Sequence, residues 1–459
     1  METDTIAAIA TAMTDSGIGI VRISGKEALR VLSRIFQPKK RGLEVTKLPS
    51  HTVTYGHVYD GETMIDEVLV LYMKGPHSYT AEDTVEIDCH GGVLVMKRVM
   101  ETVVRNGARP AQAGEFTKRA FLNGRIDLSQ AEAVAELIHS KNEYARKSSL
   151  RQLKGSVSEK IEGLRGRILY ETAFLEAALD DPEHMSLDGY RERLRGTMAE
   201  VKGEIKALID SADGGRMLSE GIKTVILGKP NAGKSSVLNL LLGEERAIVT
   251  DVAGTTRDTL EEHLVLGGIS LNLMDTAGIR DTEDIVEKIG VERAMDHAKD
   301  ADLILYVVDS AAGLTGEDER IMEAIQEKQA VILFNKSDLE QALTMEEAKE
   351  LFAGRPVISF SAREGTGLSE LTDEVSRLFF SGMVRFNDEI YITSARQKHA
   401  LEKAFESLGQ VETSIENGMP EDFYSIDLMD AYETLGLITG ETVSEDLALE
   451  IFDKFCMGK

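Results

Sequence analysis

The chain has 459 residues, 42% of them hydrophobic, and a formal net charge of −27 at pH 7. This length is too great for one domain of about 100–200 residues, and the apolar content excludes general disorder. The excess of acidic residues argues against a protein that binds nucleic acid or an anionic membrane with its whole surface. With only two cysteines, a disulfide framework and a four-cysteine zinc site are also excluded.

The N-terminus and the apolar runs give no signal for a membrane. The first residues carry Glu2 and Asp4 and no basic group, unlike a secretory signal. No apolar run approaches the roughly 18 residues of a membrane span. We therefore expect a cytoplasmic protein with no membrane contact.

Residues 1–118 mix short apolar runs with turn signals. The runs at residues 18–23, 68–73 and 85–87 predict strands, and apolar residues at helical spacing predict a helix over residues 93–104. We expect this segment to form a small α+β domain.

The rest of the chain changes pattern twice. Residues 119–218 are rich in Ala, Glu, Leu, Arg and Lys at helical spacing, residues 219–380 alternate strand runs with helices, and residues 381–459 return to the helical pattern. The alternation predicts a mixed, mostly parallel sheet with helices on both faces. Its expected strands are residues 224–227, 271–274, 303–308, 331–334 and 357–359. The predicted fold class is therefore multidomain α+β and α/β, with an α/β domain inserted into a discontinuous helical domain.

A phosphate-binding motif follows the first strand of the inserted domain. Gly228-Lys-Pro-Asn-Ala-Gly-Lys-Ser ends at Ser235 and opens a helix. In such loops the backbone amides wrap the phosphates, the lysine (here Lys234) reaches the β and γ oxygens, and the serine hydroxyl binds Mg²⁺. The N-terminus of the helix adds its positive end. A chance glycine-rich turn is the alternative, which the flanking strand and helix disfavour.

Three further strings follow strands in the order of a guanine-nucleotide hydrolase. Asp275-Thr-Ala-Gly can hold Mg²⁺ through water and sense the γ-phosphate with a glycine amide. The aspartate that ends Asn335-Lys-Ser-Asp can accept hydrogen bonds from the ring N–H and amino group of guanine, while Ser361-Ala is placed for a backbone amide to meet the guanine oxygen. The expected nucleotide-binding residues are Asn231, Ala232, Gly233, Lys234, Ser235, Ser236, Thr250, Thr255, Thr256, Asp275, Thr276, Ala277, Gly278, Asn335, Lys336, Asp338, Ser361 and Ala362.

The loop at residues 250–258 is the expected switch segment, and we choose Thr256 as the Mg²⁺ ligand that joins Ser235. Ile279 occupies the place where many small GTPases carry a glutamine that orients the attacking water. An isoleucine cannot orient water, and no arginine finger can be assigned from spacing. Another group must therefore assist hydrolysis.

Several short sequence strings outside these motifs are also distinctive. They are Arg22-Ile-Ser-Gly, Gly75-Pro with Glu82-Asp, Phe121-Leu-Asn-Gly and the terminal Cys456-Met-Gly-Lys. Together with the GTPase motifs, they resemble the MnmE (TrmE) family of tRNA modification GTPases over essentially the whole length. The resemblance implies a homodimer whose chains have a tetrahydrofolate-binding and dimerisation domain at residues 1–118, a helical domain at 119–218 and 381–459, and a GTPase domain at 219–380.

The resemblance implies a potassium ion between the nucleotide and a loop, in place of an arginine finger, when the two GTPase domains of the dimer meet. Asn231 would supply its side-chain ligand, and Thr250, Val252 and Thr255 would add oxygens. A cation there neutralises the charge that develops during transfer. Glu287 is implied as the catalytic residue that orients water, although the sequence alone favours an exposed acid on a helix.

The resemblance also implies a folate site formed by Arg22, Glu86, Arg125 and the C-terminal Lys459. Basic groups suit the glutamate tail of folate, and a carboxylate suits the N–H edge of its pterin. The family often carries lysine at the position of Arg125, so the role is kept with a different geometry. Cys456 is implied as a catalytic acid/base or nucleophile near the uridine, with a buried or incidental cysteine as the alternative.

The implied function is addition of an aminomethyl or carboxymethylaminomethyl group at carbon 5 of the wobble uridine of certain tRNAs. A one-carbon tetrahydrofolate, in methylene or formyl form, would be the donor, and a flavin-dependent protein of the MnmG (GidA) type the partner. Residues 97–154, with 12 Lys and Arg against six Asp and Glu, are either solvated helix faces or a contact for tRNA phosphates. A GTP-driven switch in ribosome assembly is the chief rival function, and a membrane-remodelling GTPase is a distant third.

Overall fold

The computed structural model describes residues 4–244, 262–274, 296–352, 354–380 and 392–441, together with Phe452 and Gly458. The chain divides into two compact units. The first consists of Met1–Ala135, Gln152–Phe174 and Leu428–Lys459. The second consists of Glu136–Arg151 and Leu175–Asp427.

The first unit contains a seven-stranded sheet in the order β3-β4-β5-β6-β2-β1-β7, in which only the β1–β7 pair is parallel. The predicted strands of this segment are confirmed as β2, β5 and β6. The strands are β1 (Ile6–Ile9), β2 (Ser16–Ser24), β3 (Phe36–Pro38), β4 (Thr52–Asp60), β5 (Thr63–Met73), β6 (Thr84–Gly91) and β7 (Arg109–Pro110). The short helices beside them are α1 (Ala28–Ile35), η1 (Val45–Lys47) and α2 (Val93–Arg105), the last of which confirms the predicted helix.

The two faces of this sheet differ in composition, as strand β6 shows. Its residues Val85, Ile87 and Cys89 are buried in one apolar cluster with side chains of α1 and α2. Because side chains alternate along a strand, Glu86 and Asp88 lie on the opposite face, where both are only partly buried. That face carries the residues of the candidate folate site.

Helices α3 (Glu115–Leu122), α4 (Leu128–His139), α5 (Glu143–Leu153), α6 (Ser156–Asp180) and α15 (Asp422–Thr439) complete the elements that belong wholly or partly to the first unit. In α6 the predicted apolar stripe is buried, as Ile161 and Ile168 illustrate. Arg165 of α6 donates a hydrogen bond to the carbonyl of Tyr432 in α15 at 3.1 Å, and its guanidinium lies 4.1 Å from the centre of that ring. These contacts join segments that are far apart in the sequence.

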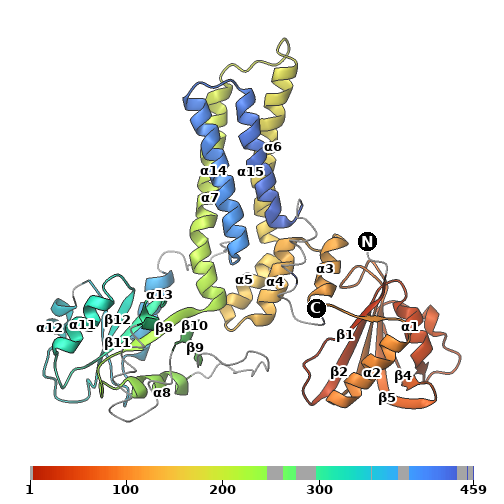
Figure 1. Ribbon diagram of the computed structural model, residues 1–459, viewed down its shortest axis with the longest axis horizontal. Coiled ribbons are helices and arrows are strands. Elements are labelled where there is room, and N and C mark those ends of the chain that lie inside the picture. The colour runs from red at the N-terminus through yellow and green to blue at the C-terminus, as the bar shows by residue number, and fades with distance from the viewer. Residues whose placement is uncertain are drawn as a thin grey trace. The chain divides into compact units, whose positions relative to one another are not determined.

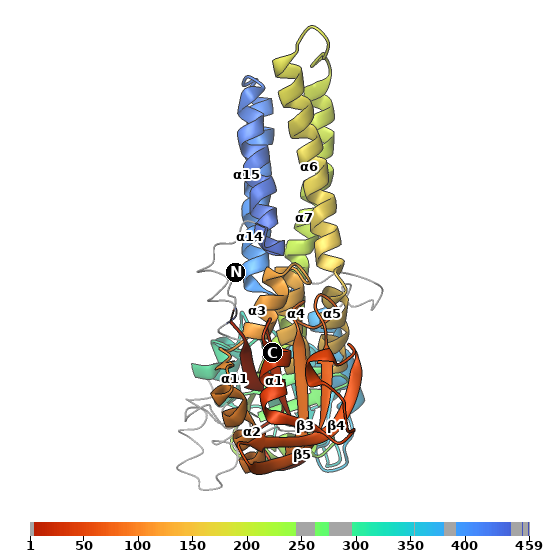
Figure 2. The ribbon, with the colours of Figure 1, turned by 90° about the vertical axis from the view of Figure 1, so that its right-hand side faces the viewer.

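In the second unit, the long helix α7 (Tyr190–Glu220) packs along α14 (Ala395–Glu416), as Figures 1 and 2 show. Lys202 and Glu412 form an ion pair between them. At Gly215 a Cβ atom would lie 2.1 Å from the carbonyl oxygen of Ile392, so only glycine permits this approach. Within the described ranges of the chain, no helix is long and apolar enough to cross a membrane.

Helix α7 leads directly into a six-stranded sheet in the order β13-β12-β11-β8-β10-β9, in which only β9 is antiparallel to its neighbour. All five strands predicted for this segment are confirmed. The strands are β8 (Ile222–Leu227), β9 (Glu262–Leu266), β10 (Ile269–Leu273), β11 (Leu303–Asp309), β12 (Ala330–Asn335) and β13 (Val357–Ser359). Helices α8 (Lys234–Glu244) and α13 (Leu368–Phe380) pack in one apolar cluster with the sheet, and α11 (Gly316–Ala324) and α12 (Met345–Leu351) pack in another.

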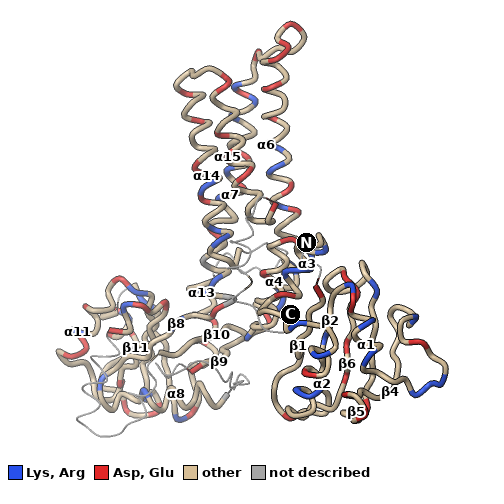
Figure 3. Tube along the Cα trace, turned by 45° about the vertical axis from the view of Figure 1, so that its right-hand side comes forward, with Lys and Arg blue, Asp and Glu red and all other residues tan. Residues whose placement is uncertain are grey.

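Charged residues of both signs are interspersed along the helices, including α6 and α7 (Figure 3). In the first unit, part of the basic stretch at residues 97–154 is engaged in ion pairs. Buried Arg119 pairs with Asp4, Glu82 and Glu115, and Arg109 also pairs with Glu115. Arg119 of α3 thereby links this helix to Asp4, which precedes β1, and Arg109 links it to β7. Both cations also balance the buried carboxylate of Glu115, because a buried charge requires close partners of opposite charge.

Candidate functional site

The phosphate loop lies between β8 and α8, at the carboxyl end of a central parallel strand. Lys234 donates from its Nζ atom to the carbonyl oxygens of Gly228 at 2.9 Å and Lys229 at 2.8 Å. Gly233 has a φ of 101°, and a Cβ atom there would lie 2.2 Å from Nδ2 of Asn335. Backbone and lysine are thus arranged around the loop as the motif predicts.

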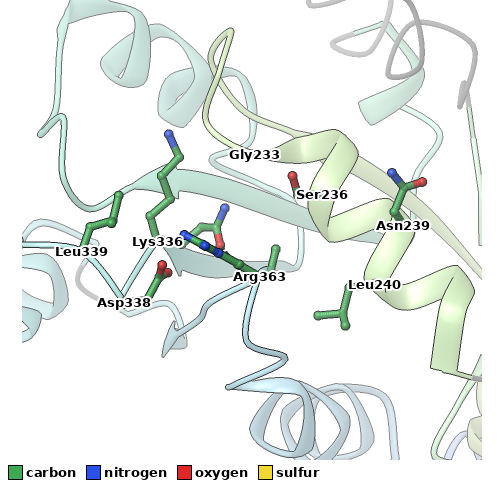
Figure 4. A pocket seen from close by; sticks show the side chains of 10 residues that line it. Gly233, Ser236, Asn239, Leu240, Lys336, Asp338, Leu339 and Arg363 are labelled. Carbon is green, nitrogen blue, oxygen red and sulfur yellow. Dashed lines mark hydrogen bonds between the residues drawn. The ribbon is translucent and has the colours of Figure 1, made fainter.

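A pocket of about 600 Å³ opens beside this loop, within the range of nucleotide-sized sites. Figure 4 shows its lining, which comes from α8 and from the loops after β12 and β13. The lining residues are Gly233, Ser236, Asn239, Leu240, Asn335, Lys336, Asp338, Leu339, Ala362 and Arg363. The predicted phosphate and base motifs therefore meet at one place.

Hydrogen bonds connect the phosphate loop with the two base motifs, Asn335-Lys-Ser-Asp and Ser361-Ala. Asn335 donates from Nδ2 to the carbonyl of Ala232 at 2.9 Å and accepts from the amide of Ala362 at 3.0 Å. The hydroxyl of Ser361 donates to Asp338 at 2.7 Å. This bond is the main reason that the pKa of Asp338 lies below its usual value, so the side chain is an ionised acceptor at neutral pH.

Lys336 links the base motif to the phosphate loop. Its Nζ atom lies 2.5 Å from Asp309 at the end of β11 and donates to the carbonyl of Asn231 at 2.9 Å. Both Lys336 and Asn231 have positive φ angles, 64° and 61°. Asp309 is a positioning residue that the sequence interpretation did not include.

Sequence reasoning also missed Arg363 and the α8 residues Asn239 and Leu240, which line the pocket. The signal for Arg363 was present, because it directly follows Ser361-Ala in the third motif. The two α8 residues lie one helical turn beyond the phosphate loop, and only the packing of α8 against the sheet brings them to the pocket.

A buried ion pair anchors the phosphate loop to α11. Lys229 lies 2.7 Å from Asp318, and the side chains are 11% and 3% exposed. The hydroxyl of Tyr306 donates to the same carboxylate at 2.5 Å, and the amide of Thr315 donates to it at 2.6 Å. Burial alone would raise the pKa of Asp318, but the bonds from Lys229 and Tyr306 outweigh it and lower the pKa.

Replacing Lys229 by methionine is expected to weaken GDP binding by about tenfold. The change leaves buried Asp318 without its cation, and the unpaired charge costs up to about 3 kcal/mol. We expect a shift of the loop that admits water to reduce this cost to about 1.4 kcal/mol, which is tenfold. Fluorescence titration with a labelled GDP measures the affinity, with exposed Lys223→Met as the matched control. Asp318→Asn in the Lys229→Met background should recover part of the loss; unchanged affinity in Lys229→Met would contradict the anchoring role.

In the first unit, three of the four predicted folate residues, Arg22, Glu86 and Arg125, are linked to the ring of Tyr79, directly or through Arg22. Arg22 of β2 pairs with Glu86 of β6 at 2.7 Å, in register across the two strands, and donates to the carbonyl of Gly458 at 3.2 Å. The guanidinium of Arg22 lies 5.6 Å from the centre of the Tyr79 ring, and that of Arg125 lies 4.9 Å from it. The contact with Gly458 places this one residue of the C-terminal string at the cluster.

Asp88 adds an acceptor to the same sheet face, two residues after Glu86. Its Oδ1 atom is buried and has no hydrogen-bond partner among the residues placed by the structure. Burial, and then the charge of Glu86, raise the pKa of Asp88. A buried acceptor without a donor suits a ligand that brings N–H groups.

The remaining predicted site residues lie outside the described residues. They are Thr250, Val252, Thr255, Thr256, Asp275, Thr276, Ala277, Gly278, Glu287, Cys456 and Lys459. Ser235 and Ser236 are described and are exposed at the start of α8.

A mostly parallel sheet with a phosphate loop after β8 and base-recognition motifs after β12 and β13 defines a P-loop GTPase. The family models named MnmE helical domain and GTP-binding protein TrmE N-terminus match residues 128–456 and 5–125. The chain belongs to the MnmE family of tRNA modification GTPases.

Relatives agree over the full length. The tRNA modification GTPase MnmE of Lachnoclostridium phytofermentans is 55% identical and covers 100% of both chains. That of Clostridioides difficile is 47% identical and covers 99% of both. Among solved structures, the G domain of the T. maritima FeoB iron transporter is 27% identical over 34% of this chain and 97% of its own, with a TM-score of 0.26.

Proposed function

We propose that this GTPase depends on potassium and, with a flavin-dependent partner of the MnmG/GidA type, modifies carbon 5 of the wobble uridine of certain tRNAs. The added group is aminomethyl or carboxymethylaminomethyl, and a one-carbon tetrahydrofolate is the donor. The observation that carries the proposal is the cluster of Arg22, Glu86, Arg125 and Gly458 around Tyr79. A GTP-driven switch alone has no use for such a second site.

The hydrogen-bond donors and acceptors of this cluster match those of a folate. Arg22 and Arg125 suit the carboxylates of the glutamyl tail, and Glu86 and Asp88 suit the N–H edge of the pterin. Folate would supply the one-carbon unit, while these side chains bind and orient it. Lys459, next to Gly458, would complete the site, and Cys456 would act near the uridine.

In the GTP site, separate residues would bind the phosphates, hold the two metal ions and orient the attacking water. Lys234 would contact the β and γ oxygens, and Ser235 and Thr256 would hold Mg²⁺. Asn231, Thr250, Val252 and Thr255 would hold K⁺, and Glu287 would orient the attacking water. Carboxamide, hydroxyl and carbonyl oxygens are the donors that hard cations prefer.

The assembly proposed is a homodimer through residues 1–118, with the helical segments 119–218 and 381–459 carrying the GTPase domain, residues 219–380. We place the activity in the cytoplasm with its tRNA substrate. The net charge of −27 opposes strong tRNA binding by the chain alone, so the partner would supply most phosphate contacts.

Deleting the gene is expected to remove the modified wobble uridine from total tRNA, as nucleoside mass spectrometry measures it. The restored gene and its exposed-residue variant Lys223→Ala should bring the nucleoside back, and Lys234→Ala should not. If the uridine stays fully modified in the deletion strain, the ribosome-assembly switch replaces this proposal.

A further inference from the structure

The ring of Tyr79 is shared by two guanidinium groups. Those of Arg125 and Arg22 lie 4.9 and 5.6 Å from its centre, both within the distance of cation–π attraction. The two arginines come from distant parts of the chain, β2 and the turn after α3, and no resemblance or motif assigned a role to Tyr79. An aromatic ring at this point restricts where both cations can lie.

The position of Tyr79 is itself fixed by a hydrogen-bond network. Its hydroxyl bonds to that of buried Thr117 in α3 at 2.8 Å. The next residue, Thr80, is held from both sides, since Asn123 donates to its carbonyl at 2.7 Å and Ser24 bonds to its hydroxyl at 2.6 Å. Tyr79 is therefore a preorganised platform, and ligand binding need not order it.

The two arginines differ in how their charge is balanced. Arg22 is 15% exposed, pairs with Glu86 and donates to Gly458. Arg125 is exposed, and among the residues whose positions are described no carboxylate pairs with it. The cluster thus holds one uncompensated guanidinium against an aromatic ring.

A planar guanidinium binds a carboxylate through two parallel N–H bonds, which a lysine ammonium cannot do. A nucleic-acid phosphate would be the other anion to consider, but Glu86 and Asp88 on the neighbouring strand disfavour a highly charged polyanion and favour a ligand that also carries N–H donors. Folate combines such an edge with the carboxylates of its glutamyl group.

We propose that Tyr79 is the positioning residue of a carboxylate subsite, in which its ring holds Arg125 for the glutamyl group of the folate. The inference rests on the proposed folate function and deepens it. It assigns the glutamyl end of the ligand to Arg125. It also gives a reason for arginine at this position, because a guanidinium can stack on the ring of Tyr79 and bind a carboxylate through two hydrogen bonds.

The test compares two ligands by calorimetry on the full-length protein: 5-formyltetrahydrofolate and its pteroate analogue, which lacks the glutamyl group. Tyr79→Leu is expected to weaken binding of the glutamyl ligand by up to about fivefold, the size of a cation–π contact at an exposed site, and to leave the affinity for the analogue unchanged. Tyr79→Phe keeps the ring but loses the hydroxyl bond to Thr117, so it should retain most of the difference in affinity between the two ligands. Arg125→Gln, which removes the charge at an exposed position, should show at least the same selective loss as Tyr79→Leu.

Tyr170→Leu removes an exposed tyrosine elsewhere in the same unit and is the matched control, with no expected effect on either ligand. Equal weakening of both ligands by Tyr79→Leu would overturn the glutamyl assignment, as would loss of tRNA binding with unchanged folate affinity. If the wild-type protein binds neither ligand, the proposed folate function fails first and the subsite with it.

Discussion

Asp338→Asn is expected to lower kcat/KM for GTP by at least about 100-fold and to raise kcat/KM for XTP. In the proposed site the carboxylate of Asp338 would accept the ring N–H and the amino group of guanine, and each hydrogen bond to a charged acceptor is worth about 1.5–3 kcal/mol. Loss of two such bonds therefore amounts to about 3 kcal/mol or more, which is about 100-fold. An asparagine amide can instead donate to the carbonyl that xanthine carries in place of the amino group.

The structure gives a reason to expect that Asp338→Asn changes the preference from GTP toward XTP without disturbing the fold. Ser361 bonds to one oxygen of Asp338 at 2.7 Å, and Asn335 ties the neighbouring loops together through Ala232 and Ala362. An isosteric asparagine keeps this frame, so the effect should fall on the base and not on folding. Steady-state rates with GTP and XTP measure it, with the exposed α13 variant Asp373→Asn as control; an unchanged preference for GTP would refute the assigned role in base recognition.

Strands with a strong local sequence pattern were predicted, and strands with a weak pattern were not. Strands β8, β11 and β12 are apolar runs buried on both faces between helices, and such runs are visible in sequence. Strand β4 was not predicted, because Val53 and Tyr55 are exposed and Gly56 interrupts the run. That glycine is required only by tertiary packing, since a Cβ atom would lie 2.6 Å from the ring of Phe36.

The same distinction applies to the sites. The residues expected to contact phosphate and base could be named from the sequence, because their chemistry demands short motifs at fixed places after strands. Lys229 and Tyr79 could not, although each lies inside a recognised string or next to one. Their partners, Asp318 for the lysine and Arg125 for the tyrosine, are separated from them by many residues and meet them only in the folded chain.

The geometry of the phosphate loop gives the potassium proposal a definite residue to test. Asn231 has a φ of 61°, and its side chain is exposed at the crest of the loop. Its carbonyl is held by Lys336 at 2.9 Å, and Lys336 is held in turn by Asp309. The side-chain amide is thus carried on a fixed backbone in the phosphate loop. A cation bound there would offset the charge that develops during hydrolysis, as an arginine finger does in other GTPases.

Replacing K⁺ by Na⁺ at constant ionic strength is accordingly expected to lower the kcat for GTP by at least about tenfold, since a single well-placed electrostatic contact is worth about 10²–10³ in rate. Asn231→Ala should bring the ratio of the K⁺ and Na⁺ rates close to one while GDP binding persists, because Lys234 and the loop amides still hold the phosphates. Asn417→Ala, at an exposed position after α14, should keep the wild-type ratio. Equal rates in the two salts for the wild-type protein would remove potassium from the mechanism, and a persistent cation preference in Asn231→Ala would move its ligand to another residue.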